Sequence, residues 1–258
     1  MKKLRMIITS ALAVAFIGAL GLSSGIVSAD VASGKADLGA GSGIKFGTLP
    51  SNPANPFDPN ASVNTCTLSA IGYDSSDNLV GISVGHCPFN TQNVKNDPTW
   101  NQVSGVKDSV LGQVGTVVKS VYQPTNSNGT PKATDPDYSV ILFDKDKVNP
   151  LQTVGRTTVN GIATTLPANG SIACKEGRTT AQTCARVGSS DSNQIRTAMM
   201  FAMGGDSGSP LVNANDGKLI GYLQGSGGFL GLETTFVNIH KTLNAINTAG
   251  GVGSGFHL

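Results

Sequence analysis

Short runs in which apolar and polar residues alternate recur along most of the chain, and Gly, Pro, Asn and Asp residues separate them. Alternation with a period of two places every second side chain on the same face, as in a half-buried β-strand. The runs with this pattern, which we expect to form strands, are 44–47, 66–72, 79–84, 110–122, 137–143, 157–166, 171–187, 194–203, 210–224 and 234–239. Residues 237–248 instead carry apolar side chains at helical spacing, which predicts a helix near the C-terminus.

Polar segments divide these strands into two groups. The segments that we expect to be loops are 50–64, 88–108, 124–136 and 144–150. The last of them is charged and separates an N-terminal unit, 44–150, from a C-terminal unit, 151–258. Many short strands in two similar groups, followed by one helix, predict an all-β protein built from two packed antiparallel β-barrels.

The first 29 residues have the pattern of a secretory signal peptide. Basic residues occupy positions 2, 3 and 5, an apolar run covers 6–22, and Val27-Ser28-Ala29 resembles a cleavage site. Polar residues and a glycine interrupt the apolar run, which favours a removed signal over a retained membrane anchor. Residues 30–43 are small and polar, so we expect a short flexible segment there. The chain is therefore predicted to be secreted.

The balance of charge argues against two classes of partner. The signal peptide contains three of the 18 Lys and Arg residues and no acidic residue, so 15 basic residues remain against 16 acidic ones. A nearly neutral chain lacks the basic surface that nucleic acids or anionic membranes attract. We therefore expect neither nucleic acid nor, after signal removal, a membrane as a partner.

The four cysteines are Cys66, Cys87, Cys174 and Cys184. An even number in an exported chain favours disulfides, and four cysteines allow three pairings. Pairing of sequence neighbours would place one bridge in each half of the chain. Their spacing matches no zinc pattern and histidines are few, so we expect no metal.

The candidate nucleophile lies in the turn Gly204-Gly205-Asp206-Ser207-Gly208-Ser209-Pro210. Glycines on both sides of Ser207 allow positive φ angles and leave backbone N–H groups unobstructed. The N–H groups of Gly205 and Ser207 could then point at one spot, as an oxyanion hole requires. The alternative interpretation is an ordinary Gly- and Ser-rich surface turn.

A serine nucleophile needs a base and a group that orients the base. Of the three histidines, His86 alone follows an apolar strand and precedes a cysteine. Asp137 begins a strongly β-forming run. Taken singly, His86 could be a ring packed under a disulfide and Asp137 a residue that starts a strand. Together with Ser207 they form a His-Asp-Ser triad in a known chain order.

Four segments resemble motifs of the chymotrypsin-like serine proteases, in particular the secreted bacterial streptogrisin and α-lytic type. They are 84–87 (Val-Gly-His-Cys), 137–141 (Asp-Tyr-Ser-Val-Ile), 205–210 (Gly-Asp-Ser-Gly-Ser-Pro) and the hairpin between Cys174 and Cys184. The resemblance spans about residues 40–245. It implies two six-stranded β-barrels with the triad between them, polypeptide substrates, no cofactor and a monomer.

The resemblance also suggests roles for residues outside the triad. An internal cation should pair with Asp206, and Lys175 stands where the bacterial relatives usually have an arginine, with Arg178 as a second candidate. Counting back from Ser207 places Phe201 at the specificity position. Gln224, Gly225 and Ser226 fall in the segment expected to form a pocket wall. We therefore expect an uncharged substrate residue before the cleaved bond.

Two departures from the family pattern concern the serine loop and the pocket. Ser209 stands where glycine is more frequent, and the disulfide that usually flanks the specificity pocket has no cysteines here. The sequence thus predicts a secreted serine endopeptidase, of either broad or narrow specificity. The alternative is a catalytically silent trypsin-like fold that acts as an extracellular binding protein.

Overall fold

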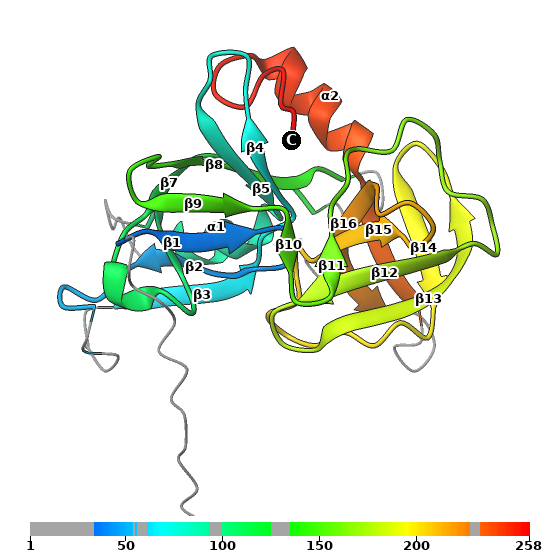
Figure 1. Cartoon of the computed structure of the whole chain (residues 1–258), viewed down its shortest axis with the longest axis horizontal. Helices are drawn as coiled ribbons and strands as arrows, with labels where there is room; N and C mark the ends of the chain where they lie inside the picture. The colour runs from blue at the N-terminus through cyan, green and yellow to red at the C-terminus, as the bar shows by residue number, and fades with distance from the viewer. Residues whose placement is uncertain (1–33, 54, 56–60, 93–99, 125–134, 228–232) are drawn as a thin grey trace, which may run out of the picture. The chain divides into compact units, whose positions relative to one another are not determined.

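A computed structural model describes residues 34–53, 55, 61–92, 100–124, 135–227 and 233–258 (Figure 1). The predicted signal peptide, 1–29, lies outside these residues. Strands dominate the described part of the chain, and the helix α2 follows the last strand. Among the described residues, no helix has the length and apolar character needed to span a membrane.

The first half forms an antiparallel sheet in the order β3-β2-β6-β7-β8-β5-β4. Its strands are β2 (Gly43–Thr48), β3 (Ser62–Thr67), β4 (Ala70–Tyr73), β5 (Leu79–Ser83), β6 (Gln102–Gly105), β7 (Gly115–Tyr122) and β8 (Asp137–Phe143). Apolar residues of these strands and of their connections form one core, in which Phe46, Leu68 and Ile141 are fully buried. Burial of each such side chain contributes about 1.5–3 kcal/mol to folding.

The second half is a closed barrel with strand order β12-β13-β14-β17-β16-β15. Its strands are β12 (Ile172–Gly177), β13 (Ala181–Ser190), β14 (Gln194–Ala198), β15 (Pro210–Asn213), β16 (Leu219–Gly227) and β17 (Glu233–Asn238). Ile195, Leu211, Leu223 and Phe236 fill its interior. The expected all-β class with two packed antiparallel units and a C-terminal helix is confirmed.

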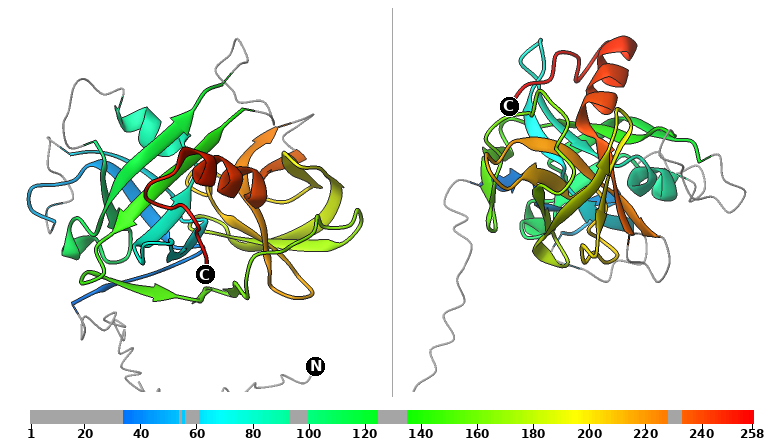
Figure 2. Two further views of the ribbon diagram at one scale, coloured as in Figure 1. Left: turned by 90° about the horizontal axis from the view of Figure 1, so that it is seen from above. Right: turned by 90° about the vertical axis from the view of Figure 1, so that its right-hand side faces the viewer.

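The helix α2 (Ile239–Ala249) lies where the two halves meet (Figures 1 and 2). Asn238 caps it, because its side-chain oxygen accepts a hydrogen bond from the N–H of His240. Ile239, Thr242 and Ile246 are buried, and the two isoleucines join the core cluster that also contains residues of the first sheet. The helix predicted over 237–248 is therefore present and begins two residues later.

The described part of the segment predicted to be flexible, 34–43, is ordered. β1 (Ala36–Gly39) pairs in parallel with β9 (Val148–Leu151), and Leu38 is buried. Small residues here serve close packing, since an added Cβ at Gly39 would overlap the main chain of Leu151. The same pairing places the expected domain boundary, between residues 150 and 151, inside a strand.

The first half differs from the expected six-stranded barrel in several details. Its sheet has seven strands and, among the described residues, no hydrogen-bonded closure. The predicted loop 88–108 contains most of helix α1 (His86–Gln92), with Pro88 in its first turn, and also contains β6. The start of the predicted strand 110–122 belongs to a 3-10 turn, η2 (Ser109–Leu111), which Gly112 ends at positive φ.

In the second half, the predicted strand 157–166 is short. Only β11 (Thr157–Thr158) forms there, paired with β10 (Thr153–Val154), and Gly161 turns the chain soon afterwards at a φ of +129°. The predicted strand 171–187 is a hairpin of β12 and β13 with a turn between them. In both places the residues that turn the chain end a strand which the apolar pattern alone would continue.

Candidate active site

His86 and Asp137 lie together because their strands are neighbours in the first sheet. β5 pairs with β8, with Ser83 opposite Ser139, so the residues after β5 meet the first residue of β8. The Oδ1 atom of Asp137 accepts hydrogen bonds from the backbone N–H groups of Gly85 (2.8 Å) and His86 (2.9 Å). These bonds hold the carboxylate against the chain that carries the imidazole.

The His86 ring also faces this carboxylate. Nδ1 lies 3.0 Å from Oδ2 of Asp137, whose side chain is fully buried, whereas the side chain of His86 is 20% exposed. This geometry favours a proton on Nδ1 and a lone pair on Nε2. Among the described residues, Nε2 has no hydrogen-bond partner. The ring is therefore oriented on one side and available as a base on the other.

Tyr122 packs edge-on against the His86 ring, with 5.8 Å between the ring centroids. Burial raises the pKa of Tyr122, and the negative charges of Asp137 and Asp135 raise it further. The phenol is therefore neutral near neutral pH. It confines the imidazole without adding a charge beside it.

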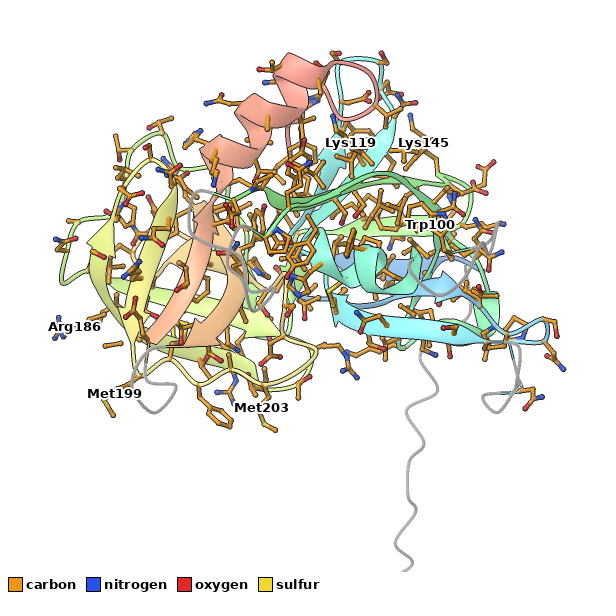
Figure 3. All side chains as sticks on the ribbon, turned by 180° about the vertical axis from the view of Figure 1, so that it is seen from behind. Trp100, Lys119, Lys145, Arg186, Met199 and Met203 are labelled. Atoms are coloured by element: carbon orange, nitrogen blue, oxygen red, sulfur yellow. A yellow bond between two sulfur atoms is a disulfide. The ribbon has the colours of Figure 1, made fainter. Side chains whose placement is uncertain are left out.

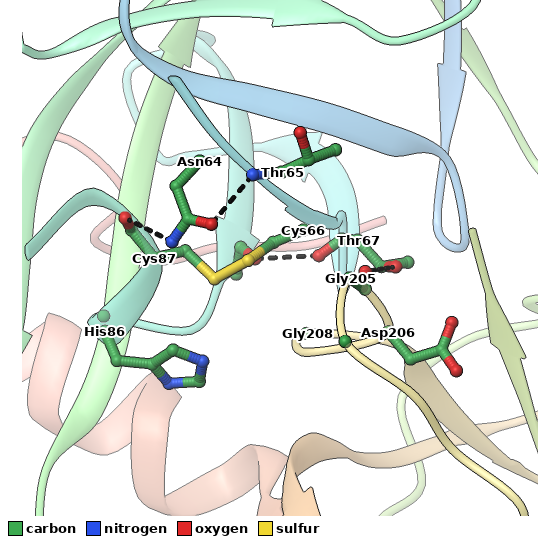
Figure 4. The surroundings of a disulfide bond; sticks show 12 residues. Asn64, Thr65, Cys66, Thr67, His86, Cys87, Gly205, Asp206 and Gly208 are labelled. Carbon is green, nitrogen blue, oxygen red and sulfur yellow. Dashed lines mark hydrogen bonds between the residues drawn. A yellow bond between two sulfur atoms is a disulfide. The ribbon is translucent and has the colours of Figure 1, made fainter. Parts of the chain in front are cut away.

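A disulfide fixes the helix that carries His86. Cys87 is bonded to Cys66 in β3, and the side chain of Asn64 donates a hydrogen bond to the carbonyl of Cys87 (Figure 4). The second bridge joins Cys174 to Cys184, directly opposite in the β12–β13 hairpin. The pairing of sequence neighbours is therefore confirmed, with one bridge in each half.

The turn around Ser207 is tied to the first half through its carbonyl groups. Thr67 donates from its backbone N–H to the carbonyl of Ser207 (2.8 Å) and from Oγ1 to that of Gly205 (2.9 Å). Ser69 donates from Oγ to the carbonyl of Gly208 (2.7 Å). Gly208 has a φ of +87°, and an added Cβ would clash with the Thr67 carbonyl. The close approach therefore requires glycine at this position.

The N–H groups of Gly205 and Ser207 remain available. The N–H of Asp206, between them, donates to the carbonyl of Met203. Within the described part of the chain, the N–H groups of Gly205 and Ser207 donate to no other residue. Two free donors flanking a bonded one are what the predicted oxyanion hole needs.

The end of β3 relates the base to the nucleophile. His86 is next to the cysteine bridged to Cys66, and Ser207 is hydrogen-bonded to the adjacent Thr67. Ser207 is partly exposed, and its Oγ makes no hydrogen bond with His86 or any other described residue. The structure thus bonds His86 directly to Asp137, and it ties the loop of Ser207 to the end of β3 without a hydrogen bond between Ser207 and the ring. Such bonds are often long before a substrate binds.

Asp206 is held by a separate network of hydrogen bonds around its fully buried side chain. Lys175 Nζ lies 3.5 Å from its Oδ2, and both side chains have no exposed surface. Burial alone would raise the pKa of Asp206. Hydrogen bonds from Thr180, Met203 and Thr179, together with the charge of Lys175, outweigh burial and lower this pKa. Lys175, and not Arg178, is therefore the ion-pair partner of Asp206.

The expected pocket residues have different environments. Phe201 is 62% exposed, while its carbonyl accepts a hydrogen bond from Thr183 Oγ1. Gln224 is buried and its Nε2 has no partner. An added Cβ at Gly225 would meet no atom within 4 Å, and Ser226 is exposed. Phe201 thus presents an exposed ring and does not form a buried pocket floor.

Sequence reasoning missed two apolar neighbours of Phe201. Met199 is 76% exposed and Met203 is 55% exposed, and both project from the edge of the second barrel (Figure 3). Met200 between them is buried, with its carbonyl bonded to Thr234. We call Met199, Phe201 and Met203 the apolar ridge. Their alternation along the chain is the signal for it, but the predicted strand 194–203 runs over these positions, whereas β14 ends at Ala198.

One cluster has the composition of a metal site. The ligand atoms of Cys66, His86 and Cys87 lie within 4.8 Å of one another. Both sulfurs are consumed in the disulfide, so neither offers the thiolate that a metal requires. The cluster therefore belongs to the bridge beside His86.

No protein-family model and no curated protein sequence matches the chain. Solved structures do. A Nocardiopsis protease is 20% identical with a TM-score of 0.54, over 82% of this chain and 97% of its own. Thermobifida fusca protease A is 20% identical with a TM-score of 0.54, over 81% and 96%. A glutamic acid-specific serine protease is 18% identical with a TM-score of 0.55, over 81% and 97%.

The fold is that of the chymotrypsin-like bacterial serine proteases. The double β-barrel implied by the sequence motifs is thereby confirmed, and each of these proteases is covered almost completely by the match.

Proposed function

We propose that the chain is a secreted serine endopeptidase with the triad His86, Asp137 and Ser207. The observation that carries the proposal is the environment of His86. Its Nδ1 is bonded to a buried carboxylate, while its Nε2 has no partner among the described residues. The strand end next to it holds a serine turn with two free N–H groups.

In the proposed reaction, Ser207 Oγ attacks the peptide carbonyl carbon and His86 Nε2 takes the hydroxyl proton. The N–H groups of Gly205 and Ser207 bind the resulting oxyanion. The tetrahedral intermediate collapses, His86 gives the proton to the leaving amine, and an acyl ester on Ser207 remains. Water then attacks the ester with His86 again as base, which releases the carboxylic acid and regenerates Ser207. Asp137 stabilises the imidazolium that forms in each step.

The proposed location rests on the leader and on the bridges. Both disulfides join cysteines of one chain, and such bonds persist in oxidising surroundings. All groups of the proposed mechanism come from one chain, so a monomer would suffice. The polypeptide would be its only partner in the reaction.

For the substrate we propose an uncharged residue before the cleaved bond. The apolar ridge continues directly into Gly204 and Gly205, and the expected wall segment contributes an uncharged amide and glycine. An exposed apolar surface beside such a site favours apolar side chains.

The proposal is tested with an active-site probe. A fluorophosphonate should label the purified protein, and the alanine variant Ser207→Ala should lose both labelling and turnover of casein. Ser76→Ala, at an exposed turn of the first half, is the matched control and should behave as the wild type. Labelling that survives in Ser207→Ala would contradict the assignment.

A second candidate, an extracellular binding protein with this fold, is favoured by one observation. Ser207 Oγ is not hydrogen-bonded to His86 in the structure. A folded wild-type protein that neither reacts with the fluorophosphonate nor cleaves a mixed peptide library would support this candidate over the protease.

A further inference from the structure

Side chains of the second half donate hydrogen bonds to main-chain carbonyls at and just before Asp137, the first residue of β8. Tyr222 in β16 donates from its hydroxyl to the carbonyl of Asp137, at 3.0 Å. Lys241 in α2 donates from Nζ to the carbonyl of Asp135, at 3.4 Å. The carboxylate of Asp137 is bonded to the loop before His86, so the same residue is held from both directions.

The hydroxyl of Tyr222 also lies 2.6 Å from Thr242 Oγ1 in α2. A phenol has a single proton, and Tyr222 uses it for the Asp137 carbonyl. The proton between the two hydroxyls therefore belongs to Thr242. The hydrogen bonds run in one direction, from Thr242 to Tyr222 to the main chain of Asp137.

Burial makes this arrangement rigid. Tyr222 has no exposed surface and Thr242 is 2% exposed. Burial also raises the pKa of Tyr222, so its hydroxyl remains a donor at any working pH. An unsatisfied hydroxyl at this depth is costly, which holds both side chains in the bonded orientation.

Charged groups around this contact come from several elements. Lys241 is half-buried, and burial lowers its pKa while the carboxylates of Asp135, Asp191 and Asp137 oppose that shift. His86, Tyr122 and Tyr222 also lie near the charge of Asp137, and Tyr138 lies near Tyr222. One cation in α2 thus faces three carboxylates, one of which belongs to the proposed triad.

We propose that α2 positions the triad: Thr242 and Tyr222 fix the main chain at Asp137, and Lys241 fixes the preceding turn, so that the carboxylate orients the His86 ring. Thr242, Tyr222 and Lys241 are positioning residues that touch neither substrate nor reacting atoms. This inference rests on the proposed function, because it assigns a task to α2 in the same site.

The test compares variants that differ by one hydroxyl. Thr242→Val and Tyr222→Phe each interrupt the relay, that is, the hydrogen bonds from Thr242 to Tyr222 to the carbonyl of Asp137, with almost no change in shape. Thr242→Ser keeps the donor. We expect a fall of about 10- to 100-fold in kcat for the first two, an unchanged KM and near wild-type kcat for Thr242→Ser. The double variant should lose no more than either single one, because both remove the same relay.

A second measurement does not depend on activity. In Ser207→Ala protein, the proton on His86 Nδ1 gives a low-field NMR signal, and its exchange with solvent reports how firmly Asp137 holds it. Thr242→Val and Tyr222→Phe should accelerate this exchange, and Thr242→Ser should restore it. Lys241→Met should also accelerate it, and Lys241→Arg should restore the wild-type rate.

The outcomes separate the two proposals. Unchanged kcat and unchanged proton exchange in folded Thr242→Val and Tyr222→Phe proteins would overturn the positioning role. So would equal losses in Thr242→Ser and Thr242→Val. A wild-type protein without turnover, in which the variants still accelerate the proton exchange, would overturn the proposed protease and keep the positioning of Asp137.

Discussion

Each half of the molecule buries one carboxylate of the serine protease pattern, and the two carboxylates have opposite surroundings. Asp137 and Asp206 both have fully buried side chains. The partner of Asp137 is His86, which is 20% exposed, whereas the partner of Asp206 is Lys175, which has no exposed surface. The comparison indicates that burial of the acid is common to both sites, and that exposure of its partner distinguishes them.

The hydrogen bonds of the two carboxylates extend this difference. Asp206 accepts bonds from the backbone of Thr179, Thr180 and Met203, from Thr180 Oγ1 and from Lys175. All of these donors point to the carboxylate, so the network ends at Asp206. The bonds of Asp137 lead to an imidazole whose second nitrogen has no partner among the described residues. One network stabilises a turn, and the other orients the proposed base.

The largest expected effect distinguishes the two acids by activity. Asp137→Asn should lower kcat by about 10⁴-fold, as in a characterised Ser-His-Asp triad, because the amide favours the wrong tautomer of the ring. Steady-state kinetics on a peptide library would measure it, with far-UV circular dichroism to verify the fold. Wild-type activity in this variant would transfer the role to Asp135, which is also buried.

The next effect concerns stability. Lys175→Met leaves Asp206 charged and buried without its cation, so the free energy of unfolding should fall by about 3–5 kcal/mol in urea denaturation. The matched control is Lys145→Met, which removes an exposed ion pair with Asp77 and should cost at most about 1 kcal/mol. Equal losses in both variants would contradict the anchoring role of Lys175.

Another buried carboxylate, Asp74, is bonded to no cation among the described residues and tests what hydrogen bonds achieve alone. Bonds from Asn78, Gly253 and Ser76 outweigh burial, which by itself would raise the pKa, and lower the pKa of Asp74 to about 2. Because the folded pKa is depressed, its stabilisation is present above the unfolded value of 3.8 and is lost as the pH falls towards 2.

For this residue we expect Asp74→Asn to lower the free energy of unfolding by about 1–2 kcal/mol at pH 7 and to flatten its decline in acid. Urea denaturation at pH 7, 4 and 2.5 would measure the difference. An Asp74→Asn protein whose stability falls in acid as steeply as that of the wild type would show that other groups dominate.

The smallest effect concerns Met203, whose backbone belongs to the Asp206 network and whose side chain belongs to the apolar ridge. Met203 bonds Asp206 through its backbone N–H, while its side chain is exposed. Met203→Ala should therefore leave the unfolding free energy within about 0.5 kcal/mol and raise KM a few-fold for apolar peptides only. Phe201→Ala should act in the same direction. A large loss of stability in Met203→Ala would show instead that its side chain supports the Asp206 network.

Much of the fold follows from local patterns. Alternation locates most strands, and apolar spacing locates α2 to within two residues. The types of His86, Asp137 and Ser207 and the turn glycines indicate the chemistry, because only three histidines can supply the base and one of them follows an apolar strand. The pairing of Lys175 with Asp206 follows only from the resemblance, since nothing in their spacing shows that they meet.

What could not be predicted depends on contacts between residues far apart in sequence. Ser69 bonds Gly208 across 139 positions and Tyr222 bonds Asp137 across 85, and no local pattern records either. The strand β1 escaped prediction because its small residues suggest flexibility until their neighbour, β9, is known. The exposure of Phe201 likewise depends on the hydrogen bonds of its carbonyl to distant residues such as Thr183, and not on its position in a motif.

The end of β3 is connected both to the proposed base and to the proposed nucleophile. Cys66 is covalently joined to the helix of His86, and the next residue, Thr67, grips the loop of Ser207. We therefore expect a relative motion of the two halves to displace His86 and Ser207 together. Reducing that one bridge would leave His86 held only by Asp137 and Tyr122, so we expect the site to loosen under reductant before the β-sheets do.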